Sequence, residues 1–507
     1  MRRQFAALCC AVVLLVLLAG CQGFGVGSDG DGTATASPTP EADYVFTLDG
    51  EGSDDTAAPT ATPPADGARP DPENDTIGWE NGYWHDETLS VTTDDGLNES
   101  ERAAVVARSM ARVEFVRQLE FERSVPVDTV SRAAYRANNT YETGETLRRF
   151  DNAKFEALFL VGEDRDSVAT QQGTLGSSVL GYYSSRRDAI VLVTDSETPT
   201  IDEATLGHEL VHALQDQHFG FDGSARTRDA VQGRNGLVEG DAAATEDRYV
   251  ARCGEQWDCL SGGAGGGGGG GDRHFGISFL VYFPYSDGPG LVENLHDRGG
   301  WARVNEAYDE TPEGAREVMR PEDYPAWEPR NVTLSDRSTD EWERVRPSTD
   351  RDRPDYAVVG PSAIAASMAY TLADGYNESA VVSRRAVFNY AASGGLDSTD
   401  PYNYALPATT EWEGGRMYAY TRANATNTTE TAYVWRTVWS DEAAAATFAT
   451  TWEAVIAHWG GTETADGNWV IESESPFADA VAVRVDGNTV TVVNAPTEAD
   501  LHEVHDA

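Results

Sequence analysis

The feature that most constrains the fold is a pair of histidines, His208 and His212, inside a segment with the pattern of an amphipathic helix. Thr200 and Glu203 form a Thr-x-x-Glu pattern, which predicts a capping box at the start of this helix. Apolar residues then recur at helical spacing, at Leu206, Leu210, Ala213 and Leu214. Because residues four apart lie one turn apart on the same helix face, both imidazoles project to one side.

The spacing of these histidines suits a metal ion. Two imidazoles in this arrangement can both reach one tetrahedral zinc ion, at about 2.0–2.1 Å. Glu209 follows the first histidine, so its carboxylate can reach a zinc-bound water rather than the metal. Zinc lowers the pKa of such a water toward about 7, and Glu209 would take its proton as the water attacks a carbonyl group. The alternative is a pair of exposed histidines with a salt-bridging glutamate between them.

A catalytic zinc site needs a third protein ligand, which leaves the fourth position to water. His218 stands downstream of His208, but the HExxHxxGxxH pattern that uses such a histidine requires glycine where this chain has Gln215. Two later glutamates remain, Glu239 and Glu246, in a segment that we expect to be a second helix opening near Glu239. We favour Glu239, because small residues on its face would allow close approach to the helix of His208. The alternative is that Glu239 is a solvated surface acid.

Three segments of the chain resemble a family of gluzincin-like zinc metallopeptidases among the surface lipoproteins of haloarchaea and bacteria. The matching segments are His208–His218, Val238–Ala242 and Phe283-Pro284-Tyr285. The resemblance spans residues 79 to 325, with a weaker part around 430 to 459. It implies a zincin-like α+β fold with the active-site helix after a small sheet, and Glu239 as the third zinc ligand. It also implies that the strand before this helix pairs with an extended peptide substrate.

The resemblance further implies an aromatic or imidazole group that stabilises the oxyanion of the reaction. Tyr282, Tyr285 and His296 are the candidates, and we prefer Tyr285. Asp216 and Asp241 are candidates for orienting the ligand imidazoles through their second ring nitrogen. The alternative is plain packing for the three rings and surface exposure for the two acids.

The N-terminus has the pattern of an export signal. Arg2 and Arg3 precede an apolar run from Phe5 to Leu18 that is too short to span a bilayer. The run ends in Leu18-Ala19-Gly20-Cys21, which resembles a lipobox, so we expect residues 1–20 to be removed and Cys21 to carry a lipid. The protein would then be anchored to the cytoplasmic membrane and face the outside. The alternative is a plain secretory signal with an incidental cysteine.

Two further cysteines remain in the body of the chain, Cys253 and Cys259. A single close pair on an exported protein predicts a local disulfide, and the alternative is that both bind a metal. Glycosylation sequons fit an external protein as well. They occur at Asn74, Asn98, Asn138, Asn331, Asn377, Asn424 and Asn427.

The charge of the chain is strongly negative, with 84 acidic residues against 38 basic ones and a formal net charge of -46. Lys154 is the one lysine. Acids spread along the whole chain, together with loss of lysine, indicate a solvated surface adapted to high salt, as in a halophilic archaeon. A basic partner or polycationic substrate is the alternative. Binding to nucleic acid is disfavoured, because no basic patch is present to neutralise phosphates.

Composition divides the chain into regions. Residues 21–78 are rich in small and polar residues and predict a flexible stalk, and Gly262 to Gly271 form a second flexible segment. We expect the zincin-like domain at 79–326 and a separate α+β region at 327–507.

The expected elements of the two regions follow from their apolar patterns. In the first region they are a helix at 100–121, a helix or strand at 153–161 and a hairpin at 179–194. In the second region they are helices at 361–372 and 440–458, a strand pair at 416–422 and 432–438, and a hairpin at 480–485 and 489–493.

These patterns together predict a surface-anchored zinc metalloendopeptidase that hydrolyses peptides or proteins. The alternative is a non-catalytic binding or envelope lipoprotein that keeps a zincin scaffold. Glu209 favours the enzyme, because a pure binding module has no need of it.

Overall fold

The computed structural model describes residues 71–505 except for 92–94, 139–142, 177–178, 180, 197, 222–224, 262–272, 348–353, 378, 424 and 426–429. The expected signal, Cys21, most of the expected stalk and the glycine run lie outside the described residues. Among the described residues, no helix has both the length and the apolar character needed to cross a membrane.

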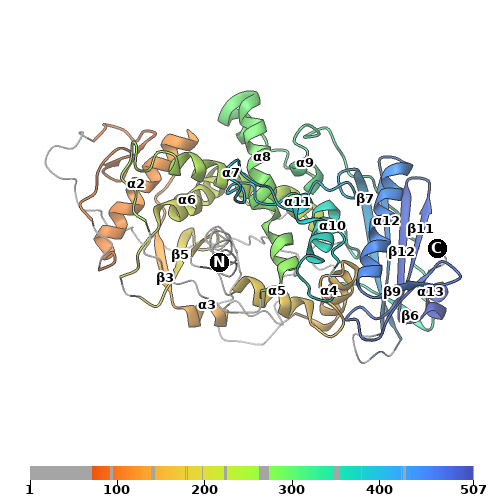
Figure 1. Cartoon of the computed structure of the whole chain (residues 1–507). Coiled ribbons are helices and arrows are strands. Elements are labelled where there is room, and N and C mark those ends of the chain that lie inside the picture. The colour runs from red at the N-terminus through yellow and green to blue at the C-terminus, as the bar shows by residue number, and fades with distance from the viewer. Residues whose placement is uncertain are drawn as a thin grey trace, which may run out of the picture.

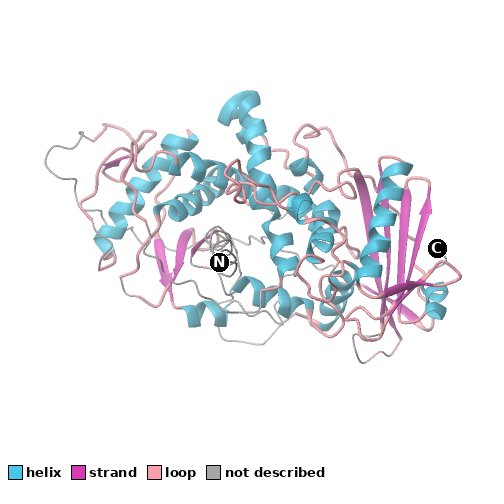
Figure 2. Ribbon diagram, viewed as in Figure 1, coloured by secondary structure: helices cyan, strands magenta, loops and turns pink. Residues whose placement is uncertain are grey.

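The described chain is a mixed α/β molecule (Figures 1 and 2). Its helices are α2 (Glu99–Arg117), α3 (Arg132–Asn138), α4 (Glu145–Ala157), α5 (Ser167–Gly176), α6 (Glu203–Phe219), α7 (Arg228–Val250), α8 (Phe275–Glu306), α9 (Ala315–Met319), α10 (Gly360–Tyr370), α11 (Arg384–Val387), α12 (Glu442–His458) and α13 (Glu498–Val504). Its strands are β1 (Trp79–Glu80), β2 (Tyr83–Trp84), β3 (Val127–Val130), β4 (Gly181–Ser184), β5 (Ala189–Val193), β6 (Trp342–Val345), β7 (Trp412–Arg422), β8 (Thr431–Trp439), β9 (Gly461–Glu463), β10 (Trp469–Ile471), β11 (Ala480–Asp486) and β12 (Thr489–Ala495).

A small sheet of order β3-β5-β4 lies beside the helix of His208, which is α6. The strand β5 pairs in parallel with β3 and antiparallel with β4, so the expected hairpin at 179–194 is confirmed. The helix expected at 100–121 is α2. The segment at 153–161, for which the sequence allowed either a helix or a strand, starts within α4 and continues beyond the end of that helix.

The start of α6 differs from the expected capping box. Its N-cap is Asp202, whose carboxylate accepts a hydrogen bond from the Thr205 amide. Glu203 is fully buried and forms ion pairs with Arg108 at 2.9 Å and Arg112 at 2.7 Å, both from α2. The capping-box prediction is therefore wrong, because the Glu203 carboxylate binds Arg108, Arg112 and the Leu260 amide instead of the start of its own helix.

The helix that carries Glu239 also differs from the expectation. It begins at Arg228 after the N-cap Thr227, so Glu239 lies in the middle of α7 rather than at its opening. The small residue next to Glu239 is Gly240, and it lies against α8 rather than α6. A Cβ on Gly240 would come within 2.3 Å of the Gly288 carbonyl oxygen in α8. We expected small residues near Glu239 to let α7 approach α6. For Gly240 this prediction is wrong, because Gly240 instead allows α7 to approach α8 closely.

The C-terminal part contains a seven-stranded antiparallel sheet of order β6-β7-β8-β12-β11-β10-β9. The strand pair, the last hairpin and the helices expected for this part are confirmed, although the N-cap of α12 is Asp441 rather than Ser440. Alternate residues of β7 face opposite sides: Met417 contacts the cluster that includes α12, and Tyr418 contacts the cluster that includes α13.

One buried cluster joins the two parts of the chain. It contains Phe155 and Phe279 from before residue 327 together with Ile364, Trp435 and Trp452 from after it. In Figure 1, α8 runs through the middle of the molecule, with the small sheet on one side and the large sheet on the other. The domain boundary at 327 stays a prediction, and the packing across it is continuous.

Candidate metal centre

The helix α6 buries both histidines of the pair. His208 is 2% exposed and His212 is not exposed, and their ring centroids are 4.9 Å apart. This placement follows from the i, i+4 spacing, which sets the two rings one above the other on the face that meets α7.

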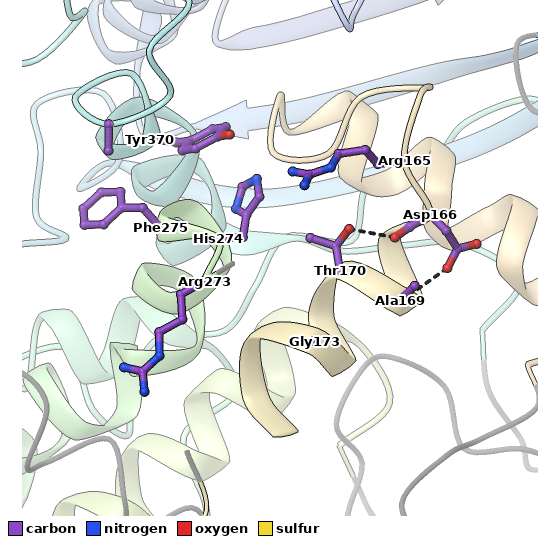
Figure 3. Close-up of a pocket in the computed structure, with 10 residues that line it drawn as sticks. Arg165, Asp166, Ala169, Thr170, Gly173, Arg273, His274, Phe275 and Tyr370 are labelled. Carbon is purple, nitrogen blue, oxygen red and sulfur yellow. Dashed lines mark hydrogen bonds between the residues drawn. The ribbon is translucent and has the colours of Figure 1, made fainter. Parts of the chain in front are cut away.

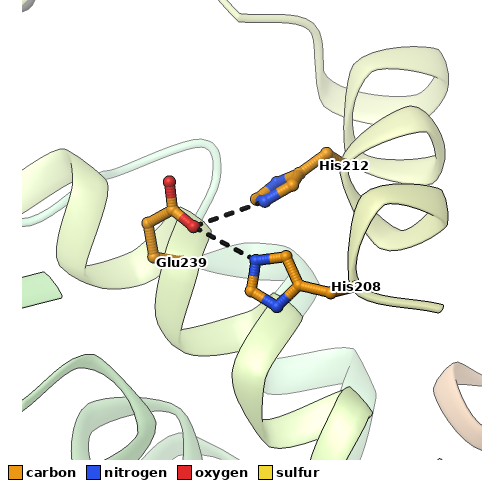
Figure 4. Close-up of side chains that lie close together, drawn as sticks. All are labelled: His208, His212 and Glu239. Carbon is orange, nitrogen blue, oxygen red and sulfur yellow. Dashed lines mark ion pairs between the residues drawn. The ribbon is translucent and has the colours of Figure 1, made fainter. Parts of the chain in front are cut away.

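Glu239 reaches the two rings from α7 (Figure 4). Its Oε2 lies 3.4 Å from His208 Nε2 and 3.3 Å from His212 Nε2. One ligand atom from each of these three side chains lies within 4.8 Å of the others. The structure thus brings together the three residues that the sequence predicts as metal ligands. Because Glu239 is only 3% exposed, its alternative as a solvated surface acid is wrong.

The other nitrogen of each ring is already engaged. His208 Nδ1 lies 3.0 Å from Glu246 Oε2, and His212 Nδ1 lies 2.8 Å from Gln215 Oε1. Both partners are acceptors, since the Gln215 amide donates through Nε2 to the Val238 carbonyl oxygen. Each Nδ1 therefore donates to its acceptor, and Nε2 is the ring nitrogen that faces Glu239 and is available to a metal ion.

Three possible ligand atoms consequently converge at one buried point. Among the described residues, His208 Nε2, His212 Nε2 and Glu239 Oε2 have no hydrogen-bond partner outside this group of three. A buried carboxylate that faces two imidazoles needs a proton or a cation between them, and two imidazoles with one carboxylate form a ligand set that zinc accepts. The residues present therefore fit a zinc ion.

The electrostatics of the centre favour positive charge. Burial would lower the pKa of His208, but its contacts with Glu239 and Glu246 outweigh burial and raise that pKa to about 10. Burial would raise the pKa of Glu239, but the two histidines outweigh it and lower that pKa to about 2. Both shifts have the same cause, which is stabilisation of a cation beside a buried carboxylate.

Glu209 lies beside the centre and is 1% exposed. Its Oε2 accepts a hydrogen bond of 2.7 Å from the Tyr183 amide of β4. Burial raises the pKa of Glu209, while the two histidines and the Tyr183 amide act against that rise. The carboxylate is thus held in place and made more basic than an exposed glutamate.

The residues that orient the histidines are partly different from those expected. Glu246 contacts His208 through Nδ1, on the side of the ring away from Glu239, so it is a partner of the ring rather than a rival ligand. Gln215 accepts from His212 Nδ1 and so orients that ring. In the sequence, Gln215 was considered only because it replaces the glycine of the HExxHxxGxxH pattern, and this role was missed. Its position three residues after His212 on the same helix is the signal that could have identified it.

Asp216 and Asp241 do not contact the histidines in the expected way. Asp216 lies 2.8 Å from the Tyr183 hydroxyl, and burial raises its pKa. Asp241 accepts from Gln215 Nε2 at 3.3 Å and from Arg117 at 2.8 Å, so it acts on His212 only through Gln215.

One of the three oxyanion candidates lies against the centre. The Tyr285 ring stacks on His208, with centroids 6.4 Å apart and planes 21° apart, and Tyr282 stacks on Tyr285. His296 packs against Trp301 further along α8. At the α-helical rise of about 1.5 Å per residue, it lies about 16 Å along the helix from Tyr285. The geometry favours Tyr285 of the three.

Cys253 and Cys259 form a disulfide in the loop after α7. Both thiols are consumed by this bond, so the alternative in which they bind a metal is wrong. The loop is attached to α2, because Arg112 donates to the Asp258 carbonyl oxygen at 3.1 Å.

A separate cavity of about 510 Å³ lies where α5, the start of α8 and the end of α10 meet (Figure 3). Its lining includes Arg165, Thr170, His274 and Tyr370, and none of the three metal-site residues. His274 caps α8 by accepting from the Ile277 amide, and burial lowers the pKa of His274 to about 4. This histidine is therefore a neutral structural group.

Comparison with known proteins covers only the C-terminal part. Residues 343–505 match a family model described as a domain of unknown function (DUF8575). No curated protein and no solved structure matches the chain. The match includes α10 to α13 and nearly all of the large sheet, but not the metal centre.

Proposed function

We propose that this chain is a zinc-dependent metallopeptidase in which His208, His212 and Glu239 hold the metal and Glu209 is the general base. The observation that carries the proposal is the convergence of three buried ligand atoms next to a buried glutamate. Three protein ligands leave one position open, which is typical of catalytic rather than structural zinc. When bound, zinc would supply Lewis acidity toward water and the peptide carbonyl group.

Glu209 accepts the proton of the attacking water and later returns it to the leaving amine. Its hydrogen bond to the Tyr183 amide fixes the direction of the carboxylate before substrate arrives. A carboxylate with a raised pKa holds a proton near neutral pH better than an exposed one, and this property suits general acid–base catalysis.

The substrate is an extended peptide or protein segment. The strand β4 is an outer strand of the small sheet, and its Tyr183 contacts Glu209, so a peptide pairing alongside β4 would lie next to the base. Tyr285, stacked on His208, is the side chain that would stabilise the oxyanion of the attacked carbonyl group.

The enzyme acts at the cell surface. The short apolar run before Cys21 supports lipid anchoring to the cytoplasmic membrane, and the disulfide between Cys253 and Cys259 supports an oxidising, external location. The excess of acidic residues supports the proposal that the enzyme is active at high salt concentration.

The test uses the full chain, purified in high salt, with bound zinc measured together with casein hydrolysis. We expect one zinc per chain and hydrolysis that falls about 10²- to 10⁴-fold in Glu209→Gln, with zinc retained. Glu306→Gln removes an exposed acid from α8 and is the matched control, which should keep full activity.

The outcomes separate the parts of the proposal. One zinc per chain without hydrolysis in the unmodified protein would overturn the peptidase and favour the binding or envelope lipoprotein. Zinc content unchanged by Glu239→Ala would overturn the ligand assignment.

A further inference from the structure

A second cluster of acidic side chains lies far from the metal centre in sequence, where α4 meets the large sheet. Glu156 comes from α4, Glu163 from the turn after it, and Asp479 directly precedes β11. One oxygen from each of the three lies within 4.8 Å of the others. The Glu163 amide also donates to the Pro476 carbonyl oxygen at 3.0 Å, so the backbones of the two segments are joined here.

Two of the three side chains are buried and Glu163 is half-buried, and the cluster lacks a protein cation among the described residues. Glu156 is 6% exposed and Asp479 is 4% exposed. Within the described ranges, no ion pair to a basic side chain is found for any of the three carboxylates. Burial and the neighbouring Glu163 raise the pKa of Glu156 to about 8, and burial raises the pKa of Glu163 to about 7. Buried carboxylates of this kind need a compensating positive charge or bound protons.

Oxygen atoms in and beside the cluster lack partners. Asp479 Oδ2 and Glu163 Oε1 make no hydrogen bond within the described part of the chain. Asn494, from β12, is 3% exposed and its side chain contacts Asp479, and its Oδ1 is likewise without a partner among the described residues. Thr431 adds a hydroxyl 3.2 Å from Glu156 Oε2. Asn494 donates to Asp479, and Asp479 also hydrogen-bonds Glu156, yet the buried Asp479 Oδ2 keeps no partner among the described residues, which is a second sign of a ligand.

The donor set identifies the class of ligand. All donors are oxygen, whereas zinc takes nitrogen and sulfur as well. Calcium binds oxygen at about 2.3–2.6 Å, so opposite ligands lie about 4.8 Å apart, and it accepts irregular sets of carboxylate and amide oxygens. Magnesium usually keeps several waters, which a buried cluster disfavours.

We propose that Glu156, Glu163 and Asp479 form a calcium site that joins the large sheet to α4. This site is independent of the zinc centre, because the two share no residue. Calcium would replace the protons of the cluster and bind the segments before and after residue 327 to one another.

The test is thermal unfolding of the full chain in high salt, with zinc kept saturating and calcium present or removed by dialysis. We expect calcium to raise the Tm and calorimetry to show one calcium per chain. Both effects should be lost in Glu156→Gln and in Asp479→Asn. Glu255→Gln, which removes one exposed acid, is the matched control and should keep both effects.

Three outcomes would overturn the site. These are an unchanged Tm with no bound calcium, an equal response to magnesium, and a calcium response that survives Asp479→Asn. Should the variants fail to fold, Tb³⁺ emission in the unmodified protein serves instead, because the buried Tyr433 lies near Glu156 and Asp479 and can sensitise it. We expect emission that calcium displaces and that weakens in Tyr433→Phe, and absence of emission contradicts the site.

Discussion

At the scale of single residues, Glu246 and Gln215 decide how the two histidines are oriented. Each accepts from one Nδ1 and so directs the other ring nitrogen, Nε2, toward Glu239. Gln215 is itself held by the Val238 carbonyl oxygen and Asp241, which keeps its amide from turning over.

We expect Glu246→Ala to weaken zinc binding by about 10- to 100-fold, because His208 loses the acceptor that fixes its tautomer. Glu246→Gln keeps an acceptor and should weaken binding less. Competition with a chelator measures the affinity, and Glu306→Ala is the control. Equal zinc affinity in Glu246→Ala and the unmodified protein would show that His208 does not depend on this partner.

At the scale of elements, the site depends on how α2 and α7 pack on α6 and on how α8 packs on α7. Glu203 attaches α6 to α2 through Arg108 and Arg112 and also accepts from the Tyr249 hydroxyl at 2.9 Å. Gly240 and Gly288 set the closest approach of α7 and α8.

We expect Glu203→Gln to lower the free energy of unfolding by about 3–5 kcal/mol, because two guanidinium groups stay buried with less compensating charge. Asp202→Ala removes the N-cap of the same helix and should cost about 1 kcal/mol. Denaturant unfolding at constant high salt compares the two. A smaller loss for Glu203→Gln than for Asp202→Ala would contradict the role of the ion pairs.

We expect Gly240→Ala to destabilise the protein and to weaken zinc binding, because the added Cβ meets the backbone of Gly288 and moves the neighbouring Glu239. Gly290→Ala is the matched control, since a Cβ there meets nothing within 4 Å. It should stabilise α8 by up to about 1 kcal/mol. Unfolding and zinc titration measure both variants, and similar behaviour of the two would refute the close helix contact.

At the scale of the whole molecule, the C-terminal part completes the core of the first part. Phe159 packs against Trp452 and Phe477, and Phe279 packs against Tyr404. The part that matches the family model therefore covers apolar surface of the part that holds the metal centre.

We expect a chain that ends at residue 342 to lose its fixed tertiary structure and its zinc, although it retains every metal-site residue. The reason is that Phe159 and Phe279 would be exposed to water. Near-UV circular dichroism and zinc content measure the result. A soluble, folded fragment with one zinc would instead show that the chain up to residue 342 forms an independent domain.

The sequence by itself determined the features that depend on local spacing. The hairpin of β4 and β5, the helices α2, α6 and α12 and the last hairpin all follow from periods of two or 3.6 residues. The same spacing put His208 and His212 on one face of a helix, and a resemblance in short segments identified Glu239.

Only the tertiary structure decided which distant side chains meet. The burial of Glu203 by α2, the contact of Gly240 with Gly288 and the gathering of Glu156, Glu163 and Asp479 join segments far apart in the chain. Local backbone geometry sets the period of a helix or strand, whereas contacts of this kind depend on how whole elements pack, and no short pattern encodes them.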